Sequence, residues 1–145
     1  MTFWADTSFL ASVYMRDANM AFAKAVLRNL TEPLPFTAFH RLELRNALSL
    51  AVFQKRIMMS EANTAWADME TDIREGRLAA CSVNWADVFR GAENLAAKHS
   101  PSIGARSLDV LHVAAAVVIG ASNLLTFDTR QGELAARAGL TLAPA

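Results

Sequence analysis

Near its start the chain reads Phe3-Trp4-Ala5-Asp6-Thr7-Ser8-Phe9-Leu10, a short apolar run followed by an aspartate, two hydroxyl residues and a second apolar run. If Phe3 to Ala5 is the end of a buried strand, Asp6 lies at its carboxyl end, where the chain leaves the sheet. Ligands bind at that edge of open α/β sheets. The stretch therefore predicts an α/β fold and places a functional carboxylate in it, for which the remaining chain should supply partners.

The composition is typical of one soluble globular domain. The 145 residues predict a single domain spanning residues 1–145, and a hydrophobic content of 53% provides for a substantial core. The formal net charge is zero, so no overall basic field indicates nucleic-acid binding, although a local groove of arginines is compatible with it.

The compartment is predicted from cysteine usage and from the apolar runs. The lone cysteine, Cys81, excludes an intrachain disulfide, and its apolar surroundings predict a core residue. We find no signal-peptide pattern and no apolar run long enough to span a bilayer. We therefore expect a protein of the reducing cytoplasm, without a membrane partner.

Strand and helix patterns alternate along the chain. Strands or extended segments are predicted at residues 2–5, 34–37, 78–83, 123–127 and 140–142. Helices are predicted at residues 9–14, 19–30, 37–56, 60–76, 85–99, 108–119 and 130–138. Thr37 and Ser60 are expected to be N-caps, and the Pro, Ser and Gly content of residues 100–104 predicts a loop. This alternation indicates a parallel sheet with helices on both faces.

Four carboxylates interrupt apolar segments: Asp6, Glu43, Asp109 and Asp128. Each alone is explained by a helix cap or a salt bridge, but a buried carboxylate needs a partner. Asp6 and Asp128 both follow strands and should share one edge of the sheet, beside the helix that Asp109 begins. Such a cluster of oxygen ligands suits Mg²⁺ or Mn²⁺, whereas the scattered histidines have no zinc spacing.

The acids lie in four segments: Ala5-Asp6-Thr7-Ser8, Glu43-Leu44-Arg45-Asn46-Ala47-Leu48, Arg106-Ser107-Leu108-Asp109-Val110-Leu111-His112-Val113-Ala114-Ala115-Ala116, and Leu125-Thr126-Phe127-Asp128-Thr129-Arg130-Gln131. These segments resemble the four motif blocks of the PIN domain, in the family's order and at its usual separations. The similarity is greatest to VapC-type toxins of type II toxin–antitoxin systems.

The resemblance implies a three-layer α/β/α PIN-like fold with a mainly parallel central sheet. It also implies a metal-dependent endoribonuclease that hydrolyses RNA phosphodiesters and leaves a 3′-hydroxyl and a 5′-phosphate. Asp6, Glu43, Asp109 and Asp128 match the acidic positions that hold Mg²⁺ or Mn²⁺. Similar toxins bind a cognate antitoxin in a groove of their N-terminal helices and commonly form homodimers. A further acid often follows the fourth aspartate in such proteins, and Thr129 stands there instead.

Four other side chains are predicted to support the acids: Ser8, Asn46, Arg106 and Thr126. The serine hydroxyl can hold Asp6, or it can simply cap a turn. The asparagine lies one turn after Glu43 on the same helix face. The arginine precedes Asp109 by three residues and can pair with it, contact phosphate or remain in solvent. The threonine either belongs to the site or only favours the strand.

Two other functional classes compete with the nuclease prediction. The first is a PIN-fold binding module that holds an antitoxin or RNA without cleavage, which the missing acid after Asp128 favours. The second is a phosphoacceptor or phosphatase domain centred on Asp6. That second class needs a lysine near the last strands, and none follows Lys98. His112 is predicted to be a core histidine rather than a general base.

Overall fold

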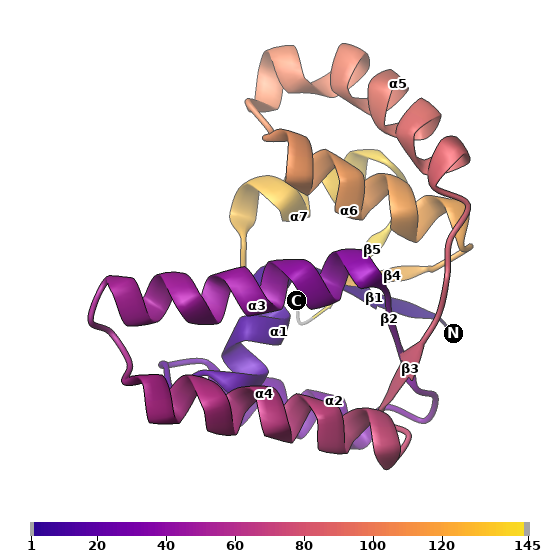
Figure 1. Ribbon diagram of the computed structural model, residues 1–145. Coiled ribbons are helices and arrows are strands. Elements are labelled where there is room, and N and C mark those ends of the chain that lie inside the picture. Colours follow the sequence, from indigo (N-terminus) through magenta and orange to yellow (C-terminus); the bar gives the residue numbers. More distant parts are fainter. Residues whose placement is uncertain (1, 144–145) are drawn as a thin grey trace. The chain divides into compact units, whose positions relative to one another are not determined.

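The computed structural model describes residues 2–143, which form two compact units (Figure 1). The first unit combines the start of the chain, up to Asp6, with the part that follows Cys81. The second unit consists of residues 7–81. Each unit has its own parallel sheet and its own helices, and each is described by itself.

The first unit contains a three-stranded parallel sheet in the order β1–β4–β5. Its strands are β1 (Phe3–Ala5), β4 (Asn123–Leu125) and β5 (Thr141–Ala143). Trp4 is paired with Leu124, and Leu124 with Leu142, so the central strand β4 is covered on both edges. Trp4 and Leu124 are fully buried, which fixes the register because a slip of one residue would turn both side chains to the other face.

Three helices belong to the first unit: α5 (Trp85–Ile103), α6 (Ser107–Val118) and α7 (Thr129–Arg137). Helix α6 contacts α5, α7, β1 and β4, as its nearly continuous apolar sequence predicts. Its run of Val113 to Ala116 is buried. The small alanine side chains allow the neighbouring elements to approach closely.

The predicted loop at residues 100–104 is wrong, because α5 continues through Pro101 to Ile103. Pro101 has no N–H to donate to the carbonyl four residues earlier, so the helix loses one hydrogen bond, and it ends within three residues. Gly104 then ends the helix in the left-handed conformation (φ 73°), and its N–H donates to the carbonyl of Ser100 at 2.8 Å.

The second unit contains four helices and two paired parallel strands among its residues. The elements are α1 (Thr7–Tyr14), α2 (Met20–Asn29), β2 (Leu34–Phe36), α3 (Ala38–Phe53), α4 (Met59–Arg74) and β3 (Leu78–Ala80). Its core is formed by side chains that are almost completely buried, among them Phe9, Leu44, Leu48 and Met69. These residues recur at helical spacing, so α1, α3 and α4 pack through their apolar faces.

Two predicted N-caps have different outcomes. Thr37 caps α3 as predicted: its hydroxyl accepts from the His40 N–H at 3.3 Å, and His40 Nδ1 accepts from the Thr37 N–H at 3.0 Å. Ser60 does not cap α4, because the helix begins at Met59. Glu61 accepts instead from the N–H of Met58 at 3.2 Å, so its carboxylate binds the free backbone donor just before the helix.

The α/β class and the parallel pairing are confirmed, since the described strand pairs are all parallel. One burial prediction is wrong: Cys81 is exposed rather than part of the core. Strand β3 ends at Ala80, and the Cys81 N–H makes a last bond to the Phe36 carbonyl before the chain leaves the sheet. Within residues 2–143 no helix combines the length and apolar character needed to cross a bilayer.

A buried polar contact joins three elements of the second unit. The hydroxyl of Tyr14, on α1, donates to Asp72 Oδ2, on α4, at 2.6 Å. Arg77 Nε, just before β3, donates to Asp72 Oδ1 at 2.6 Å. Burial and the Asp72 carboxylate raise the pKa of the Tyr14 hydroxyl, so it stays a neutral donor throughout the physiological pH range.

We predict that Tyr14→Phe lowers the free energy of unfolding by about 1.5–3 kcal/mol, because it removes a hydrogen bond to a buried carboxylate. Urea denaturation measures the change. Ser82→Ala is the control, since it removes an exposed loop hydroxyl and should change the free energy by less than about 0.5 kcal/mol. A Tyr14→Phe midpoint equal to that of the parent would show that the contact contributes nothing.

Candidate active site

Asp6 follows β1 directly and is 1% exposed. Its N–H donates to the carbonyl of Leu125 at 3.1 Å, which extends the β1–β4 ladder by one bond beyond the strands. The Thr126 hydroxyl makes a short hydrogen bond to Asp6 Oδ2. The parallel pairing of β1 with β4 thus brings a buried carboxylate to the turn that follows β4.

Thr126 links that carboxylate to Asp128. Its Oγ1 also accepts from the Asp128 N–H at 2.9 Å, so one hydroxyl bonds to the side chain of Asp6 and to the backbone of Asp128. The sequence left open whether this threonine belongs to the site or only favours the strand. In the structure β4 ends at Leu125, and Thr126 lies in the turn beside Asp6. Its role in the chemistry stays a prediction.

Asp128 is the N-cap of α7. Its Oδ1 accepts from the Gln131 N–H at 3.1 Å, while Oδ2 lies 3.7 Å from a terminal guanidinium nitrogen of Arg106. The simple explanation, a capping aspartate, therefore holds for this residue. Because the second oxygen points to Arg106, Asp128 also remains a member of the acidic cluster.

Asp109 lies in the first turn of α6, where Arg106 is the N-cap residue. The Arg106 Nε lies 3.4 Å from Asp109 Oδ2, so one guanidinium contacts both Asp109 and Asp128. The arginine side chain is 73% exposed, against 14% for Asp109 and 28% for Asp128. Ion pairs of this length and exposure are weak, and the arginine can leave at little cost.

Gln131 was not singled out by the sequence. It is buried; its backbone N–H bonds to Asp128, and its Nε2 donates to the Asp109 carbonyl at 3.3 Å. The side chain therefore ties the first turn of α7 to the first turn of α6 and fixes the spacing of the two aspartates. A glutamine three residues after an N-cap aspartate is the sequence signal that points to this position.

His112 is a core histidine, as predicted. It is 2% exposed, and its Nδ1 accepts from the indole N–H of Trp4 at 3.1 Å. This hydrogen bond joins the side chains of α6 and β1. The arrangement gives His112 a structural explanation that requires no catalytic role.

Glu43, Ser8 and Asn46 belong to the second unit. Glu43 is half-buried on α3 and accepts a short hydrogen bond from the Thr7 hydroxyl. Thr7 is a second residue that the sequence did not single out. Asn46 is exposed one turn after Glu43, and Ser8 is half-buried in α1. The contribution of these three predicted residues to the site stays a prediction.

The donor set of the first unit fits a hard divalent cation in its chemistry. Asp6, Asp109 and Asp128 offer carboxylate oxygens, the ligands that Mg²⁺ and Mn²⁺ prefer. Among residues 2–143 no group of three His, Cys, Asp or Glu side chains is arranged as a metal-ligand set. Arg106 compensates part of the charge of Asp109 and Asp128, so a cation that bound there would replace its guanidinium.

Solved structures with the same fold were found by comparison. VapC20 of Mycobacterium tuberculosis, described as a sarcin–ricin loop cleaving toxin, is 20% identical over 97% of both chains, with a TM-score of 0.68. VapBC2 of Rickettsia felis, bound to a DNA fragment from its promoter, is 14% identical over 98% of this chain and 97% of that chain (TM-score 0.66). FitAcB of Neisseria gonorrhoeae is 18% identical over 97% and 96% (TM-score 0.65). At these identities the likeness shows the fold.

The family is shown by the sequence itself. Comparison with curated protein sequences gave no significant match. The family model described as the PIN domain, in contrast, matches residues 5–137 and so includes Asp6, Asp109 and Asp128. The chain belongs to the PIN domain family.

Proposed function

We propose that this chain is a VapC-type toxin that hydrolyses RNA phosphodiesters with Mg²⁺ or Mn²⁺. One observation carries the proposal: Asp6, Asp109 and Asp128 come from distant segments and are joined through Thr126 and Arg106 within one unit. Membership of the PIN domain family and the fold shared with VapC20, a toxin described as cleaving the sarcin–ricin loop, support it.

Each residue of the site has a defined task in this proposal. The three aspartates would hold the cation, which when bound stabilises negative charge at a phosphodiester and makes water a better nucleophile at neutral pH. Thr126 fixes the orientation of Asp6 through its hydroxyl, and Gln131 fixes the two helix starts. Arg106 is exposed enough to turn from Asp109 toward a phosphate oxygen of the substrate.

The partners follow from the same resemblance. An RNA substrate and a cognate antitoxin are proposed because the solved structures of this fold include a toxin and a VapBC assembly. A homodimer, a cytoplasmic location and the participation of Glu43 remain predictions from the sequence.

A non-catalytic PIN module is the second candidate, and two observations favour it. Arg106 lies within 4 Å of both Asp109 and Asp128, with separations of 3.4 and 3.7 Å, so it already compensates part of their charge. Arg130 stands in the first turn of α7, close in sequence to the position where similar proteins often carry an acid. Such a module would bind an antitoxin or RNA and cleave nothing.

We predict that Asp109→Asn slows metal-dependent RNA cleavage by about 100-fold or more, because it removes a charge from the site while keeping the side-chain shape. Cleavage of a labelled structured RNA by the purified, partner-free chain measures the rate. Asp87→Asn is a matched control: Asp87 holds the same first-turn position in α5 and also pairs with an arginine three residues away. It should cleave like the parent.

Two results would contradict the assignment. Equal rates for Asp109→Asn and the parent would remove Asp109 from the site. A parent chain that binds structured RNA but does not cleave it with either Mg²⁺ or Mn²⁺ would support the non-catalytic module.

Metal binding is testable without any substrate. We predict that Mn²⁺ at about 100 times its dissociation constant stabilises the parent by about 2.7 kcal/mol, which raises the melting temperature by several degrees. Asp109→Asn should lose most of this shift, and Asp87→Asn should keep it. An identical shift in all three proteins would place the cation elsewhere.

A further inference from the structure

A pocket of about 250 Å³ borders the acidic cluster of the first unit. It lies between the turn that follows β4, the start of α7 and strand β5. Its walls are Thr126, Phe127, Asp128, Thr129, Gly132 and Leu142. Two of these residues, Thr126 and Asp128, belong to the candidate active site, so a ligand in the pocket would lie beside the proposed cation.

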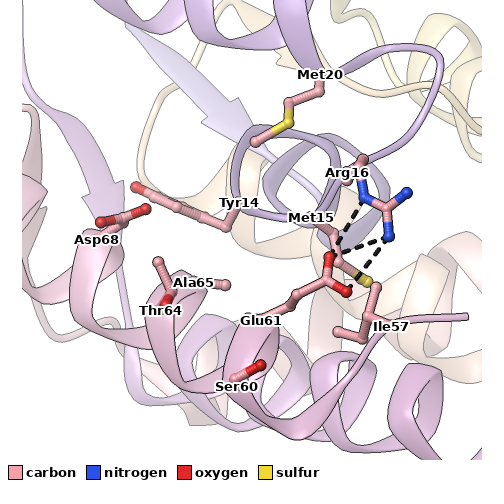
Figure 2. A pocket seen from close by; sticks show the side chains of 10 residues that line it. All are labelled: Tyr14, Met15, Arg16, Met20, Ile57, Ser60, Glu61, Thr64, Ala65 and Asp68. Atoms are coloured by element: carbon pink, nitrogen blue, oxygen red, sulfur yellow. Dashed lines mark hydrogen bonds and ion pairs between the residues drawn. The ribbon is translucent and has the colours of Figure 1, made fainter.

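The position of this pocket distinguishes it from a second pocket, which Figure 2 shows between α1 and α4 in the second unit. The second pocket measures about 260 Å³ and is lined by none of the proposed metal ligands. Its charged residues Arg16 and Glu61 pair with each other at 3.1 Å, as the dashed lines in Figure 2 mark. Of these two pockets, the one beside Asp128 is placed to receive part of a substrate whose phosphodiester is held at the acids.

Thr126 contributes to the acidic cluster and to the pocket with different atoms. Its hydroxyl donates to Asp6 and accepts from the Asp128 N–H. Its methyl group lies instead toward Gly132: a Cβ at residue 132 would come 3.8 Å from Thr126 Cγ2 and 3.2 Å from Leu142 Cδ1. This part of the wall is therefore apolar, and one added methyl group at residue 132 would press against Leu142 and narrow the pocket.

The rim of the pocket at Thr129 is polar and carries no charge. Thr129 is the exposed first residue of α7, and its hydroxyl can both donate and accept a hydrogen bond. The half-buried aromatic side chain of Phe127 also lines the pocket. An acid at residue 129 would add a second negative charge beside Asp128, whereas threonine leaves this wall neutral.

We propose that the pocket receives one base of the RNA substrate, from the nucleotide that carries the cleaved phosphodiester on its 5′ oxygen. This inference rests on the proposed function, because a cation at Asp128 would place the phosphate beside the pocket. Proteins recognise unstacked RNA bases by packing side chains against the base planes and by hydrogen bonding to the base edges. Phe127, Leu142 and the Thr126 methyl group supply the first kind of contact, and the Thr129 hydroxyl supplies the second.

The size and the charge of the pocket favour a base over other groups. Sites that enclose a whole drug-sized molecule measure about 300–1,000 Å³. A pocket of about 250 Å³ is suited to a smaller group, such as one planar base. A base is neutral and matches the neutral wall at Thr129, whereas a second phosphate would lie against the carboxylate of Asp128.

The pocket can be tested by NMR of the full chain, labelled with ¹³C at its leucine and threonine methyl groups, in the presence of Mg²⁺. Adenosine 5′-monophosphate and cytidine 5′-monophosphate are the probes, and ribose 5-phosphate is the control that has the phosphate but no base. We expect at least one nucleotide to shift the methyl signals of Leu142 and Thr129 and to bind about five- to 100-fold more tightly than ribose 5-phosphate. The signals of Leu134, which is 0% exposed, should stay in place.

Variants of the protein separate the pocket from the phosphate site. Gly132→Ala adds a methyl group against Leu142 while favouring the helix, so it should keep the fold and weaken nucleotide binding about tenfold. Gly91→Ala is the matched control, because a Cβ at this residue inside α5 would make an ordinary contact with Ala114 at 3.9 Å. Thr129→Val changes only an exposed position and should weaken nucleotide binding about two- to tenfold. All three variants should bind ribose 5-phosphate like the parent.

Two results would overturn the proposal. The first is the absence of Leu142 and Thr129 shifts with both nucleotides up to their solubility limits. The second is parental nucleotide affinity in both Gly132→Ala and Thr129→Val. A parent that cleaves RNA and gives either result keeps the proposed function and loses the base pocket. Nucleotide-induced shifts at Leu142 in a chain that cleaves no RNA would keep the pocket, as part of the non-catalytic module.

Discussion

The arrangement of the candidate site depends on a buried carboxylate at the end of a parallel strand. Asp6 is 1% exposed, and an unpartnered charge at that depth would cost several kcal/mol. The Thr126 hydroxyl supplies a donor, and the β1–β4 pairing brings it there. Because Thr126 Oγ1 also accepts from the Asp128 N–H, the hydroxyl that bonds to Asp6 also holds the residue before α7.

The other two acids are held by weaker, more exposed contacts. Asp109 and Asp128 share the exposed guanidinium of Arg106, whereas Gln131 holds their helix starts from inside. The backbone positions of the acids are thus fixed, while their Oδ2 atoms face an exposed arginine. This combination suits a site in which a bound cation supplies the positive charge. An exposed arginine can leave two carboxylates more easily than a buried one, because exposed ion pairs are weak.

In the second unit the buried charge is the Asp72 carboxylate, and side chains of the same unit bind both of its oxygens. Asp72 is bound by Tyr14 on one oxygen and by Arg77 on the other, which fixes α1, α4 and the start of β3. Asp68, one turn earlier on the same helix, has no such partner among residues 2–143.

Sequence patterns predicted the features that depend on residues close together in the chain. The apolar run before Asp6 gave the strand end, the alternation of strands and helices gave the parallel pairing, and the three-residue spacing of Arg106 and Asp109 gave one possible ion pair. The second ion pair of Arg106, with Asp128, joins segments that only the fold brings together. So does the contact of Thr126 with Asp6 across 120 positions.

The wrong predictions have specific physical causes. Proline and serine at residues 100–102 predicted a loop, but the helix continues past the one hydrogen bond that Pro101 cannot make and ends at Gly104. Serine is a common N-cap, which is why Ser60 was predicted to cap α4. The helix begins at Met59 instead, and the free N–H of Met58 donates to Glu61. Cys81 continued an apolar run beyond the point where the strand ended, so hydrophobicity alone placed it in the core.

The most direct measurement is anomalous diffraction at the manganese edge from crystals of the partner-free chain soaked in Mn²⁺. We expect a manganese peak in contact with the carboxylates of Asp6 and Asp109, with the Arg106 guanidinium displaced from Asp109. A soaked crystal that keeps the Arg106–Asp109 pair and shows no manganese at these aspartates, while the same preparation cleaves RNA with Mn²⁺, would contradict it.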